Sequence, residues 1–499
     1  MASKLTLGEC IVPLLDARRV PPLTFARTPE EAQLYLHDDR RLSMRRLALV
    51  LSIAGAVAAC GGGGAGKGGS AGGGPAPAPD DMPAVTSTTG IYRGVGRLAA
   101  ADPLPFVGNV AFAQGVGDTT FAILGLSLEN RSLNFQREPS GFTARYRVDI
   151  TLRPVTGAPV QVGREETVRV ATQPETGRTD ESVLFQQHFK LLPGPYNVIV
   201  NVRDMNAGVE SRAEGDYMVP KLAPGTSSEP ILAYQVQGRA KPADPLKLVI
   251  NPRGVVSFGG DTLLAYIEGY AFPRRQTLPF EVRDGQDSLV YRDSLRFQGG
   301  RPIESQVIRI APDSLVLGEM RLVVGSGATA RRSTAIVSFT SQWLVTSYDQ
   351  MLSLLRYFGP NPALDSLHRA APADRARLWR EFRKSSDPDP KTPQNEQLDE
   401  YFSRLATANA QIKDEGMPGW RTDRGEVFVV LGAPDEVTEQ APSTSSRVIR
   451  WVYYRYRLTL FFVDESSFGR FRLTSRSRAD YERVVSRLRR GGGETADRE

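Results

Sequence analysis

Residues 142–152 read Phe-Thr-Ala-Arg-Tyr-Arg-Val-Asp-Ile-Thr-Leu, and apolar and polar side chains alternate strictly along them. A period of two residues is typical of a β-strand that buries one face and leaves the other in solvent. The same alternation returns in residues 196–202, where Tyr196 and three valines take every second position. Two such strands in one neighbourhood predict an antiparallel sheet with one buried face.

The chain around these strands reads as two β-rich domains. The turn at residues 192–195, Leu-Pro-Gly-Pro, leads into Tyr196. This arrangement is similar to the tyrosine corner of immunoglobulin-like and fibronectin-type sandwiches. We therefore expect one β-sandwich domain over 90–237. Residues 314–324 echo residues 190–200, so a second sandwich is expected over 246–342, after a proline-containing linker.

The pattern changes after residue 342, because helical spacing of apolar residues replaces the period of two. Residues 347–358 place apolar side chains three and four positions apart, and a second and a third helix follow around Trp379 and from Leu398 to Ile412. Strands are expected at 427–431, 448–454, 458–463 and 471–473. Helices followed by a small antiparallel sheet form an α+β domain, here 345–475. A basic helical tail, 476–499, ends the chain; it places Tyr481, Val484, Val485 and Leu488 inward.

The N-terminal region contains a pattern that is typical of a targeting signal. From Met44 to Cys60 the chain reads Met-Arg-Arg, an uncharged apolar stretch too short to span a bilayer, and then Val-Ala-Ala-Cys. This pattern resembles the bacterial lipoprotein signal peptide, which implies that Cys60 is lipidated and starts the mature chain. We therefore divide this region into a spurious or disordered leader (1–43), a signal peptide (44–59) and a Gly/Pro-rich tether (60–89). The alternative is that residues 1–43 are a genuine cytoplasmic extension.

The resemblance also implies a place in the cell. Gly61, rather than an aspartate, follows Cys60, so the expected location is the outer membrane, facing the periplasm. The inner membrane and the cell surface are the alternatives. The two cysteines are Cys10 and Cys60, so the mature protein is expected to contain no disulfide.

Composition argues against several functional classes. The formal net charge is +6, and 53 arginines stand against nine lysines without a basic stripe interleaved with aromatic residues, which disfavours nucleic-acid binding. The three histidines, His37, His188 and His368, are far apart in sequence, so a histidine-based metal site or catalytic triad is not expected. The near P-loop that ends at Lys67 has Gly68 where serine or threonine is required. We expect no cofactor and no metal.

The boundary between the predicted helices and the C-terminal sheet holds the most specific motif. Residues 419–436 read Gly-Trp-Arg-Thr-Asp-Arg-Gly-Glu-Val-Phe-Val-Val-Leu-Gly-Ala-Pro-Asp-Glu. They resemble the signature of the GWxTD-domain family of bacterial envelope proteins, and the resemblance extends over about 345–475. Further short motifs occur in the expected order: Asp387-Pro388, Asn395-Glu396, Ala408-Asn409, Trp451, Tyr453-Tyr454, Phe462-Val463-Asp464 and Phe468-Gly469. The family implies no established activity.

Three interpretations of the motif remain open. Its residues are the candidate binding or structural site: Gly419, Trp420, Thr422, Asp423, Arg424, Gly425, Pro434 and Asp435. Glycines allow close backbone approach, tryptophan supplies apolar area, and threonine and aspartate bond to local amides. The motif is therefore either a loop that orients the sheet, a ligand or partner groove, or an acid pair that catalyses. We expect Arg424 to pair with Asp423, Asp435 or Glu436.

Two functions follow from these observations as hypotheses. The first is a non-enzymatic envelope lipoprotein, attached to the membrane through its lipid anchor, that binds or scaffolds other envelope proteins. The alternative is an envelope hydrolase or carbohydrate-active protein with its site near the motif. No catalytic residue is proposed, because paired acids without histidine, cysteine or a metal pattern are weak grounds for an active site. Whether a small molecule binds stays open.

Overall fold

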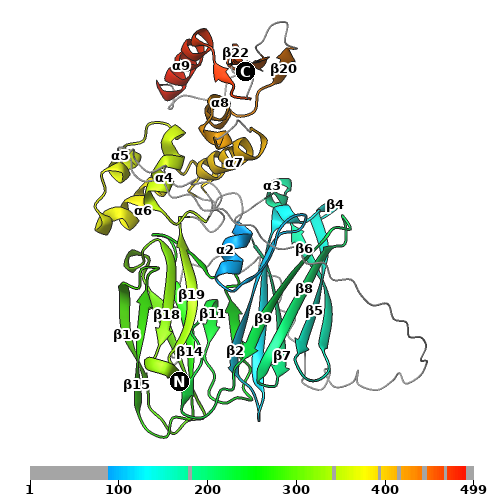
Figure 1. Cartoon of the computed structure of the whole chain (residues 1–499), viewed down its shortest axis with the longest axis vertical. Helices are drawn as coiled ribbons and strands as arrows, with labels where there is room; N and C mark the ends of the chain where they lie inside the picture. The colour runs from blue at the N-terminus through cyan, green and yellow to red at the C-terminus, as the bar shows by residue number, and fades with distance from the viewer. Residues whose placement is uncertain are drawn as a thin grey trace, which may run out of the picture. The chain divides into compact units, whose positions relative to one another are not determined.

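The computed structural model describes residues 88–177, 182–339, 344–390, 395–412, 417–440, 447–465 and 469–490 (Figure 1). All of them belong to one compact unit, Asp81–Glu499. The predicted fold class is confirmed, since β-sandwiches are followed by helices and a small α+β part. The leader, the signal peptide, the tether and Cys60 lie outside the described residues.

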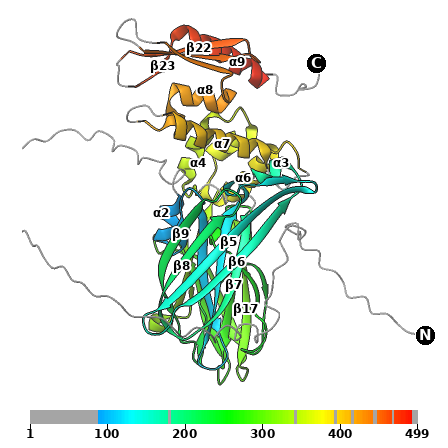
Figure 2. The ribbon, with the colours of Figure 1, turned by 90° about the vertical axis from the view of Figure 1, so that its right-hand side faces the viewer.

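The first sandwich begins after α2 (Thr88–Gly94), and both of its sheets are antiparallel. One sheet has the order β1 (Leu98–Ala100), β2 (Phe106–Gln114), β3 (Thr120–Glu129) and β7 (Ser182–Leu191). The other has the order β4 (Gln136–Glu138), β5 (Gly141–Pro154), β8 (Gly194–Asp204) and β9 (Glu210–Val219), and β6 (Val160–Val170) pairs with β5. Figure 2 shows β5, β6 and β8 side by side. The predicted alternation is confirmed, because β5 buries every second side chain from Ala144 to Leu152.

The second sandwich also has two sheets. One contains β10 (Thr226–Ser227), β14 (Leu263–Tyr270), β11 (Ile231–Gln237), β12 (Lys247–Ile250) and β17 (Ile303–Ile310). The other contains β13 (Val255–Ser257), β19 (Arg331–Ser338), β18 (Gly318–Val324), β15 (Gln276–Arg283) and β16 (Leu289–Phe297). β10 and β11 pair with β14, although we placed residues up to 237 in the first domain. The alternation of apolar and polar residues does not show which sheet a strand joins. The boundary between the two β domains expected from the sequence therefore lies too late in the chain.

Short helical turns connect these elements. They are α3 (Gln173–Thr176), η1 (Asn130–Ser132), η2 (Pro312–Ser314), η3 (Gly327–Thr329), η4 (Leu355–Tyr357), η5 (Pro372–Asp374) and η6 (Gly419–Arg421). The echo between residues 190–200 and 314–324 also has a structural counterpart. Both segments enter a strand at a glycine with positive φ, at Gly194 (145°) and at Gly318 (112°).

The two sandwiches share a buried apolar layer and a polar bridge beside it. Ile123 of β3 packs in one cluster with Ile250 of β12. Next to them, Gln186 of β7 donates from Nε2 to the carbonyl of Leu248 (2.8 Å) and accepts from the amide of Ile250 (3.2 Å). Both bonds fix the orientation of the amide, and its nitrogen lies 3.0 Å from Nε2 of His188. That ring nitrogen therefore accepts, which requires a neutral imidazole.

This bridge should make folding stability sensitive to acid. Burial lowers the pKa of His188 below its usual 6.5. The unfolded chain then takes up a proton before the folded chain does, so this contribution is complete above pH 6.5 and is lost as the pH falls below it. His188→Gln should reduce the acid-induced loss of stability, measured by urea unfolding at neutral pH and at about pH 5. His368→Gln, at an exposed site, is the control; an equal change in both variants would contradict the assignment.

The helical segment continues the core of the second sandwich. It consists of α4 (Tyr348–Leu354), α5 (Pro362–His368), α6 (Arg375–Ser385) and α7 (Glu396–Gln411). The ring of Phe339, just after β19, lies edge-on to Trp379 of α6 at 4.8 Å. Both side chains belong to one apolar cluster that runs from the second sandwich to the end of the described chain. The helices predicted at 347–358, around Trp379 and at 398–412 are confirmed.

The C-terminal part contains α8 (Asp423–Leu431), β20 (Glu436–Gln440), β21 (Arg447–Tyr453), β22 (Leu458–Asp464), β23 (Arg472–Leu473) and α9 (Ser475–Arg490). The strand expected at 427–431 is wrong, because these residues form the second half of α8. A short apolar run fits a buried helix as well as a strand. The residues at the two ends of this segment specify a helix: Thr422 caps its start, and Gly432 ends it with φ +84°.

The C-terminal helix α9 lies within the expected helical tail apart from its first residue, and it buries Tyr481, Val484 and Val485 as predicted. Leu488 was wrongly placed inward, since 41% of it is exposed. Among the described residues, no helix is both long and apolar enough to cross a membrane.

Candidate functional site

Trp420 is a core residue. It lies in η6, and its side chain is completely buried. The ring of Tyr357 meets it edge-on with 6.3 Å between centroids. The guanidinium groups of Arg356 and Arg421 cover it at 5.4 and 5.0 Å from the ring. The indole therefore joins η4, at the end of α4, to the start of α8, and it presents no face to a partner.

The two glycines of the motif allow three backbone segments to touch. A Cβ atom on Gly425 would lie 1.9 Å from the carbonyl oxygen of Gly419. A Cβ atom on Gly419 would lie 2.3 Å from the carbonyl of Ala408 and 2.1 Å from that of Ile412. The amide of Gly419 also donates to Oδ1 of Asn409 (3.1 Å). No side chain fits at either glycine, so α7, η6 and α8 pack through their backbones.

Thr422 closes this turn from inside. Its hydroxyl accepts from the amide of Gly425 at 2.9 Å and donates to the carbonyl of Gly419 at 2.7 Å. The residue is buried, so both bonds are shielded from water. This is the N-cap that starts α8.

Asp423 connects α8 to the elements that end the chain. Its carboxylate accepts from the amide of Leu473 at 2.8 Å and lies 3.5 Å from Arg472 and 3.1 Å from Arg478. Glu426, one turn later, lies 3.0 Å from the same Arg478. Both acids are therefore held by β23 and α9.

Two tyrosines border this charge cluster. Burial, and then the charge of Glu426, raise the pKa of Tyr357 and that of Tyr481 above the usual value. Both hydroxyls therefore remain protonated near neutral pH and act as hydrogen-bond donors or acceptors rather than as bases.

Arg424 and Asp435 point to other neighbours. The guanidinium of Arg424 lies 4.6 Å over the ring of Phe471. Asp435 accepts from the amide of Tyr454 (2.6 Å) and donates its own amide to the carbonyl of Val452 (2.9 Å). Pro434, before it, is half-buried. Asp423 and Asp435 thus bond to different elements, and the structure does not join them in one acid pair.

The motif therefore contains a set of structural contacts. Among the described residues, no three of the histidine, cysteine, aspartate and glutamate side chains are grouped as a metal site would require. Seven of the eight motif residues make a specific bond, cap or packing contact within the fold. A catalytic reaction at this site would have to use side chains that already make these structural contacts.

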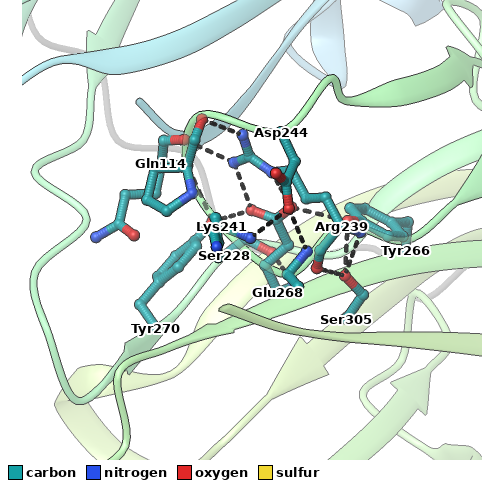
Figure 3. Close-up of polar contacts among 11 residues, drawn as sticks. Gln114, Ser228, Arg239, Lys241, Asp244, Tyr266, Glu268, Tyr270 and Ser305 are labelled. Carbon is teal, nitrogen blue, oxygen red and sulfur yellow. Dashed lines mark hydrogen bonds and ion pairs between the residues drawn. The ribbon is translucent and has the colours of Figure 1, made fainter. Parts of the chain in front are cut away.

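The structure contains a second polar cluster that we did not predict (Figure 3). Arg239, in the linker, forms a two-pronged ion pair with Glu268 of β14, at 2.7 and 2.9 Å, and both side chains are buried. The same guanidinium donates to the carbonyl of Gln114 in the first sandwich (2.6 Å). The hydroxyls of Tyr266 and Tyr270 donate to the two oxygens of Glu268. The signal was Glu268 itself, the one charged residue in the apolar run 263–270.

Comparison with known families identifies the C-terminal part. Residues 322–483 match the family model described as GWxTD domain. No curated protein sequence matches the chain.

Similarity to solved structures is slight. Trypsin-activated alpha-2-macroglobulin from Escherichia coli shares 12% identity over 48% of this chain and 17% of its own, with a TM-score of 0.16. Dimeric latent PorU from Porphyromonas gingivalis shares 12% identity over 50% of this chain and 21% of its own, with a TM-score of 0.20. The chain thus spans about a fifth of these proteins.

Proposed function

We propose that this chain, which contains a GWxTD domain, is a non-enzymatic lipoprotein of the bacterial cell envelope that binds another envelope protein. The proposal rests on the observation that the motif residues make contacts within the fold. Trp420 is buried, and Asp423 pairs with two arginines. The motif then serves to build the domain, and recognition falls to its surface. The two sandwiches act as a scaffold between this domain and the tether.

The anchor and location rest on the sequence. Val-Ala-Ala-Cys after a basic and then apolar stretch supports lipidation at Cys60, and Gly61 supports sorting to the outer membrane, facing the periplasm. A hydrolase or carbohydrate-active protein would require carboxylates aimed at one substrate. Asp423 and Asp435, bonded to separate elements, favour the binding function.

The binding surface can be tested at two exposed residues, Val437 in β20 and Tyr454 just after β21. Val437 is 60% exposed and Tyr454 is 59% exposed, and tyrosine is among the residues enriched at protein interfaces. Capture of the full chain from solubilised membranes should recover a partner with the wild type. The variant Val437→Ser with Tyr454→Ser should lose it. Val155→Ser with Leu192→Ser changes apolar residues of the first sandwich that are 77% and 62% exposed, and it is the control.

The same preparation tests the anchor. Cys60→Ala should no longer incorporate a fatty-acid probe and should leave the membrane fraction. Continued labelling would refute lipidation at this residue. Equal recovery of the partner by all folded variants would place the binding surface elsewhere, and recovery of no partner by the wild type would argue against the proposed function.

A further inference from the structure

The positive charge of the chain is concentrated in its C-terminal part. Residues 417–490 contain fourteen arginines, no lysine and nine acidic residues, a formal net charge of +5 against +6 for the whole sequence. Arginine has a planar guanidinium that binds phosphate through two parallel hydrogen bonds. An excess of arginine alone therefore suits a phosphate-bearing partner.

Much of this charge lies on the outer face of α9. Arg476, Arg483 and Arg487 are seven and four residues apart, which places them on one stripe of a helix. Tyr481 and Val484, on the opposite side, are buried against the domain. The stripe therefore faces solvent because the apolar side of the helix is already covered.

Two arginines of this helix have acidic partners, and one of them is Arg478, which pairs with Asp423 and Glu426. The other is Arg483, which pairs with Asp480 on the preceding turn. Within the part of the chain that the structure describes, the exposed arginines Arg476, Arg487 and Arg489 form no ion pair. Leu488, between the last two, is 41% exposed. Leu488 lies four residues after Val484 and therefore on the inner stripe of α9, so the outer face presents guanidinium groups alone, as in basic amphipathic helices that lie on membrane surfaces.

We propose that the outer face of α9 docks on a bilayer surface rich in anionic phospholipid. Its guanidinium groups would bind lipid phosphates. The inference rests on the proposed function in one respect, because the lipid anchor holds the chain beside a bilayer. Each basic residue contributes little at a membrane surface, so α9 acts as a second signal added to the anchor.

Vesicle flotation with the full chain carrying Cys60→Ala tests this contact without the anchor. The vesicles are phosphatidylcholine alone or an equal mixture with phosphatidylglycerol, at low and at physiological salt. The unaltered α9 should prefer the anionic vesicles, and the preference should fall as salt rises. Arg476→Glu with Arg487→Glu should weaken binding to anionic vesicles by at least about tenfold.

A matched control separates the site from net charge. Arg274→Glu with Arg275→Glu changes the charge equally at exposed positions of the second sandwich and should retain the preference. Because every protein keeps the same leader, only differences between variants count. Equal loss in both variants, or equal binding to neutral and anionic vesicles, would overturn the proposal. Either result would leave partner capture from membranes unaffected, so the two proposals fail separately.

Discussion

Trp420→Ala should lower the free energy of unfolding by about 3–5 kcal/mol, the usual cost of emptying a buried aromatic site. The indole is fully buried between Tyr357 and two guanidinium groups, so its removal leaves a cavity where α7, η6 and α8 meet. Urea unfolding of the full chain, followed by tryptophan fluorescence and by circular dichroism, measures the loss.

Two further variants define what Trp420 does. Trp420→Phe should retain more than half of the unfolding free energy that Trp420→Ala loses, because a ring still fills the site. Tyr454→Ala removes an exposed aromatic residue in the same domain and should change stability by less than about 1 kcal/mol. If Trp420→Ala unfolds like the wild type but fails to capture the partner, the motif is a binding surface and the structural assignment is wrong.

Arg239→Ala should have an effect of similar size in a different part of the molecule. Removal of the guanidinium leaves Glu268 charged and buried, and breaking a buried pair in this way typically costs about 3–5 kcal/mol. It also removes the hydrogen bond to the carbonyl of Gln114, which joins the linker to the first sandwich. Burial and the charge of Glu268 raise the pKa of Tyr270 well above its usual value, so this hydroxyl stays protonated and continues to donate its hydrogen bond to Glu268.

The double variant separates charge from packing. Arg239→Met with Glu268→Leu removes both charges and keeps most of the volume, so it should be more stable than Arg239→Ala, as expected when a buried pair is replaced by apolar residues. Arg283→Ala, which breaks an ion pair near the surface of β15, is the control and should cost less than about 1 kcal/mol. Equal stability of Arg239→Ala and the wild type would show that the pair is dispensable.

The sequence predicted those parts of the fold that depend on local periodicity. The alternation from Ala144 to Leu152 specified β5 because one face of that strand is buried. The prediction of a strand at 427–431 was wrong because the apolar side chains there fit either a strand or a helix. The helix is specified by the cap at Thr422 and the turn at Gly432.

The candidate site shows a similar limit. The motif could be recognised in the sequence, but the long-range contacts that its residues make could not. Arg424 lies over Phe471, and Asp423 bonds to Leu473 fifty residues later in the chain. Such long-range contacts leave no periodic signal. The Arg239–Glu268 pair was missed for the same reason, although a charged residue inside an apolar strand was a visible sign.

The shared core of the second sandwich and the helices limits how this protein can be divided. The family match starts at Leu322, inside β18, rather than after the sandwich ends. A fragment starting at residue 345 would lack Phe339 and leave Trp379 without that neighbour. We therefore expect the GWxTD domain of this chain to form a stable unit outside its natural context only when the strands of the second sandwich accompany it.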